Sequence, residues 1–477
     1  MSPETRARVS DEEPSGFIAR HAQRVVPPLF LSAMLVLGGA STEAVIATGV
    51  LQLLAILVLL WCLFDGRMQK LSTSGWWLVG LLLALILVIA LQLAPLPPDI
   101  WSRLPGRQEV VEAFVTVGGP LPWMPVSLAP EETVFGALKF LPPLAAFVLV
   151  ARTPLQSMVL VLPWVLVSVA AASVMVGVGQ VLGGRESPLY IYAYTNWGQP
   201  VGFMANANHQ AAFLLMTLPF AAVLAGRLLV RSETGDGDAS QGLMLAALAI
   251  TLVLGVAIAG SAAGYALGIP AVLLSILAAR ARSGWSILAL LLGAVVSVSL
   301  IGLFAFSSPV LSGLGMTDFS SSPLGRPDTY ARTIEAIKEV MPIGSGLGSF
   351  KAFFPRFEDP ALVTSTFMNH AHNDYLEFVL EFGVFGVGFI AVMLIWLIQR
   401  SLFIWRQSGS EGDRIRKAAS IALLIVVLHS LVDYPLRTTA LAGFASMCLG
   451  LMVARAGASR PRPDEEKDVP LAQHVVI

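Results

Sequence analysis

The sequence predicts an all-α polytopic membrane protein with about 12 transmembrane helices and one large loop outside the membrane. The 477 residues are 56% hydrophobic and 13% charged, with a mean hydropathy of +0.75, whereas about a quarter of the residues in soluble proteins are charged. Apolar runs of about 20 residues, the length that crosses roughly 30 Å of hydrocarbon, recur along the chain. One long polar block, residues 307–381, interrupts them. The net charge of −1 leaves no basic excess to neutralise a phosphate polymer, so nucleic acid is not an expected partner.

Twelve apolar runs meet this length, some of them marginally. The predicted spans are residues 25–42, 44–64, 75–94, 134–151, 158–182, 208–225, 242–259, 264–279, 285–306, 380–399, 417–433 and 438–455. They divide the chain into an N-terminal segment (1–24), nine spans (25–306), the polar loop (307–379), three spans (380–455) and a tail (456–477). No small-residue cleavage site follows the first run, so the first helix is expected to stay. Cys62 and Cys448 fall inside apolar runs, where a thiol is usually a small buried hydrophobe, and they predict neither a disulfide nor a metal centre.

The positions of Lys and Arg predict the orientation, because positively charged short loops stay in the cytoplasm. With residues 1–24 in the cytoplasm, 20 of the 30 basic residues fall on that side and ten on the other. Both termini are therefore expected to be cytoplasmic, and the polar loop is expected to face outward. A second outward loop, residues 95–133, is rich in Pro and Trp. It is expected to be an irregular cap at the membrane interface rather than a substrate contact.

Within the polar loop, Pro327 and Asp328 predict the start of a helix that runs to about residue 340, because Pro and an acidic residue favour a first helical turn. The expected apolar face of this helix consists of Ala331, Ile334, Ile337 and Met341. A Gly-rich turn, GSGLGSF, follows at residues 344–350.

The motif HAHND precedes the tenth span and contains His370, His372, Asn373 and Asp374. An imidazole is the best proton acceptor at neutral pH, so a histidine here can activate a hydroxyl, with Asn373 or Asp374 holding its ring. Two other interpretations stay open. The pair of histidines resembles metal ligands, although no further His or Cys lies nearby to complete a zinc site. A histidine at the interface can also simply hydrogen-bond the loop.

Several arginines on the outward side offer guanidinium groups to an anion. An exposed Arg usually extends to lipid headgroups, which is the default interpretation for Arg332 and Arg185. Arg326 differs, because it lies beside a helix N-terminus. Both the guanidinium group and the helix N-terminus attract an anion such as a phosphate. The Gly-rich turn can add backbone donors, although such a turn is more often only a turn.

Two further polar groups lie at the outward ends of spans. The sixth span opens with Asn206, Asn208 and His209, and the eleventh closes with His429, Asp433 and Arg437. Ionisable residues in membrane spans are costly and by default indicate a functional site. His429 and Asp433 are one helical turn apart, so an internal hydrogen bond between them is the structural alternative.

The order of these motifs carries a resemblance to a known family. The chain has Asn206 and Asn208, then Gly325–Arg326, a short helix, PIGSGLGSF at 342–350, AHNDYLEFVLEFGVFG at 371–386 and DYPL at 433–436. Five motifs in this order on one side of the membrane resemble the O-antigen ligase and O-antigen polymerase superfamily, most strongly over residues 200–437.

That resemblance implies a glycosyltransferase of the bacterial inner membrane, with a fold similar to the lipid-carrier-dependent GT-C class. It implies transfer of a whole glycan from undecaprenyl diphosphate to an acceptor glycan or lipid A core on the periplasmic side, with no cofactor and no metal. The essential histidine of the family falls on His372, and its diphosphate-binding arginine falls on Arg326. Many members also carry Ser-Arg-Gly between the seventh and eighth spans, where this chain has Ala262. The candidates to replace that missing arginine are Arg437, Arg185 and Arg332.

The expected reaction is one in-line displacement that inverts the anomeric carbon. His372 either accepts the proton of the acceptor hydroxyl or orients that hydroxyl. Arg326 neutralises the charge that builds up on the leaving diphosphate. The expected supporting residues are Asn208, His370, Asn373, Asp374 and Asp433. A polysaccharide flippase or transporter is the alternative, although such proteins usually place ionisable groups near the midplane in repeated halves, and no repeat is evident here. A non-catalytic assembly partner is a further alternative, and the motifs do not separate ligase from polymerase.

Overall fold

The structure, a computed structural model, describes residues 14–40, 44–233, 238–280, 296, 326–360, 368–407 and 410–455. In the first half, the elements are α2 (Pro14–Leu37), α3 (Val45–Phe64), α4 (Thr73–Leu93), β1 (Pro95–Leu96), α5 (Pro98–Trp101), α6 (Gln108–Val117), β2 (Met124–Pro125), α7 (Pro130–Lys139), α8 (Leu141–Arg152), α9 (Leu155–Met158), α10 (Val161–Leu182) and α11 (Ala207–Glu233). The second half contains α12 (Ala239–Ile258), α13 (Ala262–Arg280), α16 (Arg326–Val340), α17 (Phe350–Phe353), η2 (Phe354–Phe357), α18 (Asp374–Arg406), α19 (Glu411–His429), η4 (Pro435–Arg437) and α20 (Thr439–Val453).

The described residues form an almost entirely helical molecule, which confirms the predicted polytopic class. Among them, eight helical segments are long and apolar enough to cross a membrane, and α2 and α20 add shorter apolar helices. Eleven of the twelve predicted runs correspond to helices, α19 among them. The predicted run at 285–306 lies outside the described residues.

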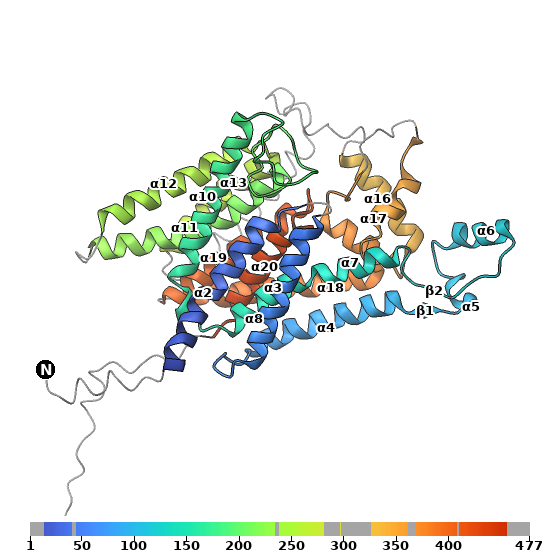
Figure 1. Cartoon of the computed structure of the whole chain (residues 1–477), viewed down its shortest axis with the longest axis horizontal. Coiled ribbons are helices and arrows are strands. Elements are labelled where there is room, and N and C mark those ends of the chain that lie inside the picture. The colour runs from blue at the N-terminus through green and yellow to red at the C-terminus, as the bar shows by residue number, and fades with distance from the viewer. Residues whose placement is uncertain are drawn as a thin grey trace, which may run out of the picture.

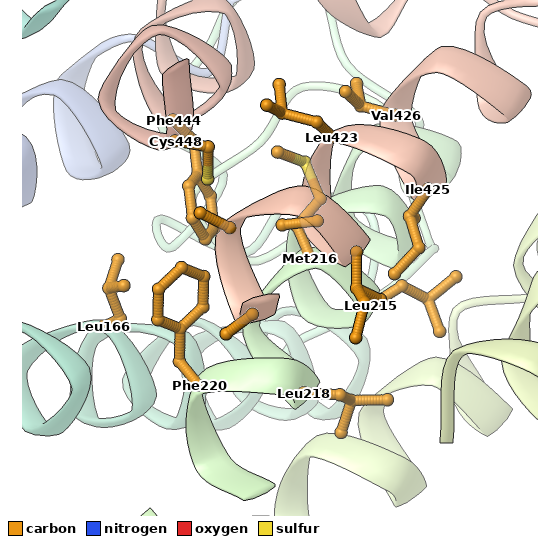
Figure 2. Packing of buried hydrophobic residues seen from close by; sticks show 14 of the residues in the cluster. Leu166, Leu215, Met216, Leu218, Phe220, Leu423, Ile425, Val426, Phe444 and Cys448 are labelled. Carbon is orange, nitrogen blue, oxygen red and sulfur yellow. The ribbon is translucent and has the colours of Figure 1, made fainter. Parts of the chain in front are cut away.

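The main hydrophobic core joins helices that are far apart in the sequence. Its largest contributions come from α10, α11, α13, α19 and α20, and α19 and α20 run through the centre of the molecule in Figure 1. The rings of Phe213 and Phe220 in α11 lie 6.1 and 5.9 Å from the ring of Phe444 in α20. Figure 2 shows residues of this core from three helices: Met216 and Phe220 of α11, Leu423 of α19 and Phe444 of α20. This packing fixes the start of α11 against the segment that connects α19 to α20.

Helix α4 packs against α18 at the side of the bundle. Leu85 and Ile89 contact Phe382 of α18 through one apolar cluster, and the two helices run alongside each other in Figure 1. The opposite face of α4 exposes large apolar side chains, including Trp76 and Trp77 at its start. Tryptophans at the end of an exposed apolar helix are typical of a lipid-facing span that is anchored at the interface.

Guanidinium groups gather at one end of the molecule, where they bind carbonyl groups near helix ends. Arg152 donates to the Gln69 carbonyl at 3.1 Å, and Arg400 and Arg416 donate to carbonyls of Met452 and Ala454 at the end of α20. The last carbonyls of a helix have no partner within the helix and carry partial negative charge, so these cations stabilise them. These three arginines are among the basic residues that the charge count places in the cytoplasm.

The loop at 95–133 is more ordered than predicted. The strands β1 and β2 pair antiparallel, and Trp101 is fully buried, with its Nε1 donating to the Pro122 carbonyl at 2.8 Å. Arg356 of η2 pairs with Glu109 of α6 at 2.6 Å and with Glu339 of α16 at 2.9 Å. The loop therefore packs on the polar block, although α6 buries no residue and projects beyond the bundle in Figure 1.

Helix α16 starts at Arg326, one residue before the predicted start at Pro327, and its buried face differs from the predicted one. Ala331 and Ile334 are exposed, while the buried residues are Thr329, Thr333, Ala336, Ile337 and Val340. The Thr333 hydroxyl donates to the Thr329 carbonyl of the same helix at 2.7 Å. This bond satisfies the hydroxyl within the helix, so the threonine methyl group can pack inward. Counting threonine as polar caused the error.

Candidate functional site

The Gly-rich turn packs directly on a break in α18. Gly383 has φ +58 and ψ −136 inside this helix, so the carbonyls of Leu380 and Glu381 lack their usual helical partners. The amides of Ser345 and Gly346 donate to these two carbonyls at 2.9 and 3.1 Å. The turn therefore completes the hydrogen bonding of the broken helix.

The remaining amides of the turn are also bonded within the protein. The Leu347 amide donates to Gln92 Oε1 at 3.1 Å and the Gly348 amide donates to Glu381 Oε1 at 2.8 Å, while the Gly344 amide donates to the Val340 carbonyl. The sequence suggested that these amides can bind an anion. In the structure they are donors within the protein, which agrees with the other interpretation, that the segment is only a turn.

The HAHND motif forms a strained turn that leads into α18. His372 has φ +52, and it is the one non-glycine residue with positive φ among the described residues. Its carbonyl accepts a hydrogen bond from the Tyr330 hydroxyl at 2.9 Å. The next residue, Asn373, caps α18 by accepting from the amides of Tyr375 and Leu376. A non-glycine residue in the left-handed region costs about 1–3 kcal/mol, and such residues are concentrated at functional sites.

The imidazole of His372 contacts a carboxylate from a distant part of the chain. Its Nδ1 lies 3.3 Å from Oδ1 of Asp433, whose side chain is fully buried, while the His372 side chain is one-quarter exposed. The expected holders of this ring, Asn373 and Asp374, have other partners, because Asn373 caps α18 and Asp374 accepts from the Ser430 hydroxyl at 2.8 Å. One ring nitrogen therefore faces Asp433, and the tautomer with its proton on Nδ1 leaves Nε2 as a proton acceptor.

Tyr434 joins three histidines into one cluster. Its ring centroid lies 4.4 Å from that of His370 and 4.9 Å from those of His209 and His372. Burial raises the pKa of the Tyr434 hydroxyl above its ordinary value, and Asp433 raises it further, so the hydroxyl stays neutral. The hydroxyl also accepts from Asn369 Nδ2 at 3.4 Å. Tyr434 thus positions imidazoles that the sequence places in separate motifs.

A second cluster surrounds Arg437. Its guanidinium group lies 2.8 Å from Glu381, 3.5 Å from Glu377 and 3.5 Å from Asp374, all on one face of the first turns of α18. Burial alone would lower the pKa of Arg437, but these three carboxylates raise it above its ordinary value. The cation is therefore permanent, and the protein's own acids outnumber it.

Glu377 connects the two clusters. Its carboxylate lies 2.7 Å from Nδ1 of His370 and accepts from the Ala371 amide at 2.8 Å. Neither Glu377 nor Glu381 was singled out from the sequence. Their spacing along an apolar helix, with acids at positions 374, 377 and 381 on one face, was the available signal.

A cavity of about 150 Å³ opens beside these clusters. Its charged or ionisable lining side chains are Glu132, Lys139, Lys351, His370, Glu377 and Arg437, and Asn369 adds an amide. Residues of α2, α3, α7, α8, α17, α18, η4 and α20 contribute to its wall. Its basic side chains can attract an anionic group. The imidazole in the wall is that of His370, and His372 is not among the lining residues.

The other predicted site residues lie nearby or outside the described side chains. Arg332 bonds the Phe357 carbonyl at 2.7 Å and Asp328 at 3.2 Å. Asn208 is in the first turn of α11, where its amide donates to Asn206 Oδ1 at 2.8 Å. Arg326 begins α16, and its side chain is outside the described part of the structure. Within the described residues, no three His, Cys, Asp or Glu side chains form a candidate metal site.

A comparison with protein-family models gives one match. Residues 246–391 match the O-antigen ligase family. This match supports the resemblance to the O-antigen ligase and polymerase superfamily that the motif order predicted. The match covers less than a third of the sequence and includes Arg326, His370, His372 and the first turns of α18. No curated protein matches the chain.

Several residues of the two clusters lie outside the matched residues. His209 comes from α11, and Asp433, Tyr434 and Arg437 come from the segment between α19 and α20. The match is consistent with a protein that is embedded in a membrane and acts on lipid-linked glycans. The predicted family is confirmed, while the roles of individual residues remain predictions.

Proposed function

We propose that the protein is a glycosyltransferase of the bacterial inner membrane that transfers a glycan from undecaprenyl diphosphate to an acceptor hydroxyl on the periplasmic side. The 3.3 Å contact between His372 and the buried Asp433 carries this proposal. An imidazole held by a buried carboxylate and still open to solvent is the arrangement of a general base. The acceptor is a glycan or the lipid A core.

In the proposed reaction, His372 Nε2 accepts the proton of the acceptor hydroxyl while the hydroxyl oxygen attacks the anomeric carbon. The bond from that carbon to the diphosphate oxygen breaks, and the electron pair leaves with the diphosphate. One such displacement inverts the anomeric carbon, and it needs no metal when cations of the protein meet the charge on the leaving group. Asp433 stabilises the imidazolium that forms.

The leaving diphosphate requires positive charge close to the cavity. Arg437 alone supplies little, because three carboxylates lie within 3.5 Å of its guanidinium group. Lys139 and Lys351 add two cationic side chains to the cavity wall, and Arg326 begins a helix whose N-terminus favours an anion. We assign the diphosphate to this set, with Arg332 at its edge.

The proposed sidedness in the membrane is supported by the positions of the arginines near the end of α20 and of the histidine cluster. The arginines around the end of α20 are separated from the His372 cluster by the length of that helix. Since positively charged segments stay in the cytoplasm, both termini are proposed to be cytoplasmic and the cluster periplasmic. The proposed architecture is the GT-C-like bundle of about 12 spans.

The test is reconstitution of the full chain in liposomes with a purified lipid-linked glycan and a candidate acceptor. The wild type is expected to form a new glycosidic bond, and His372→Ala is expected to lower the rate at least about 100-fold. Arg406→Ala, at the far end of α18, serves as the control and is expected to keep full activity. Transport of the glycan without bond formation would instead establish a flippase, and near-normal transfer by His372→Ala would remove the base from the mechanism.

A further inference from the structure

The carboxylate of Asp433 has two differently used oxygen atoms. Oδ1 faces His372 at 3.3 Å, while Oδ2 lies 3.9 Å from Nε2 of His209 and 3.9 Å from Nε2 of His429. The three imidazoles come from three elements, namely the turn before α18, the first turn of α11 and the last turn of α19. A single acid thus faces the exposed histidine on one side and two buried histidines on the other.

The two inner histidines are placed where they cannot touch a substrate. Both His209 and His429 are fully buried, whereas the His372 side chain is one-quarter exposed. The His209 ring also packs edge-on against Tyr434, with an angle of 89° between the ring planes. The group that both inner histidines share with His372 is the carboxylate of Asp433.

His209 has no evident structural reason to be a histidine. Neither of its ring nitrogens has a hydrogen-bond partner among the described residues, although buried polar groups are nearly always hydrogen-bonded. Nε2 is instead directed at Asp433 Oδ2 from just beyond hydrogen-bond distance. The apolar packing against Tyr434 alone would be met equally well by a phenylalanine.

We infer that His209 and His429 are positioning residues that hold Asp433 in its ionised form and thereby set the pH at which His372 accepts a proton. An N–H group or a positive charge facing a carboxylate favours its charged form. His372 and Asp433 are in contact and bind protons as a pair, so only the proton affinity of the pair is defined. Removing an inner imidazole destabilises the state in which Asp433 is ionised and His372 is neutral. The pair of His372 and Asp433 then binds a proton at higher pH.

Other titratable groups near the pair do not replace this function. His370 and Tyr434 also lie close to it, but His370 is bonded to Glu377, and the Tyr434 hydroxyl is neutral because burial raises its pKa. Glu377 in turn lies beside Arg437. The His209 and His429 rings each place Nε2 3.9 Å from Oδ2 of Asp433.

The inference rests on the proposed function, so its test uses one readout that does not require glycan transfer. Diethylpyrocarbonate modifies a histidine only when its imidazole is neutral. Mass spectrometry of the full-length protein can therefore follow the modification of His372 as a function of pH. We expect His209→Phe to move the midpoint for His372 to higher pH by about one unit. His209→Gln keeps an N–H donor and is expected to move it less. His21→Phe, a histidine in α2 outside the cluster, is the control and should leave the midpoint unchanged.

The second readout is the pH profile of glycan transfer by the same variants in liposomes. The acid limb is expected to shift in parallel with the modification midpoint. Unchanged midpoints in both His209→Phe and His429→Phe, with wild-type melting temperatures, would overturn the inference. If His209→Phe fails to fold, His429→Phe, which also removes an inner imidazole, decides by the same criterion. A shifted midpoint in a protein that transfers no glycan would leave the coupling intact and reject the proposed function instead.

Discussion

A β-carbon placed on Gly383 would lie 2.1 Å from the carbonyl oxygen of Pro342. This close approach holds the Gly-rich turn against the break in α18, where the Val384 amide donates to the same carbonyl at 2.9 Å. The first turns of α18 carry Asp374, Glu377 and Glu381. The geometry of the acidic cluster therefore depends on a backbone contact that only glycine permits.

Replacing Gly383 with alanine is expected to destabilise the protein by about 3 kcal/mol. The methyl group collides with the Pro342 carbonyl, and φ +58 is unfavourable for alanine. Gly388→Ala is the matched control, because Gly388 lies in the same helix with nothing within 4 Å of its added β-carbon. Thermal unfolding in detergent should separate the two variants. Equal melting temperatures would show that the turn can move away without cost.

Substitutions of His372 should show the cost of its backbone conformation. Both His372→Gly and His372→Ala remove the imidazole, so they differ mainly in how well they tolerate φ +52. The glycine variant is expected to be the more stable by about 1 kcal/mol. Both should be inactive in transfer. A less stable glycine variant would mean that the left-handed turn is not retained without the imidazole.

Arg437→Gln is expected to cost about 3–5 kcal/mol, because it leaves three buried carboxylates without their cation. Removing one acid as well, in Arg437→Gln with Glu381→Gln, should recover part of that loss. Arg332→Gln, whose partner Asp328 is about half exposed, should cost less than about 1 kcal/mol. Unfolding curves of these three variants and of Glu381→Gln alone test this ordering. If the loss of stability in the double variant equals the sum of the two single losses, the three acids do not depend on Arg437 as expected.

Asn373→Ala should cost about 1 kcal/mol through loss of the cap of α18. Its Nδ2 also donates to the Leu431 carbonyl at 2.8 Å, so the alanine variant loosens the contact between α18 and the end of α19. Asn373→Asp keeps the cap and loses only that donor. Hydrogen exchange at the amides of Tyr375 and Leu376 should increase in the alanine variant and stay near the wild-type rate in the aspartate variant.

The sequence predicted well those features that depend on local patterns. Apolar length located the helices, and Pro327 with Asp328 located the start of α16. The motif order identified the family that the match over 246–391 confirms. Each of these signals lies within a few tens of residues of the feature it predicts.

The contacts that build the site could not be predicted in the same way. His372 and Asp433 are 61 positions apart, and His209 lies in a different helix from both, so only packing of the core brings them together. The Gly-rich turn was misinterpreted for a related reason, since its amides serve a helix break that no local pattern of α18 revealed. Composition also gave no indication that the acids of α18 would surround Arg437.

Helix α20 is buried in the bundle and has 15 residues, so it rises only ~22 Å, less than the roughly 30 Å of hydrocarbon around it. At least one of its ends must then lie below the level of the headgroups. The end that meets Arg400 and Arg416 carries charge that needs water or headgroups, so we expect the recessed end to be the one at Thr438, beside the cavity. Depth measurements with a spin label at position 438 would check this. A polyprenyl-linked substrate would then reach the histidine cluster sideways, with its chain still in the bilayer.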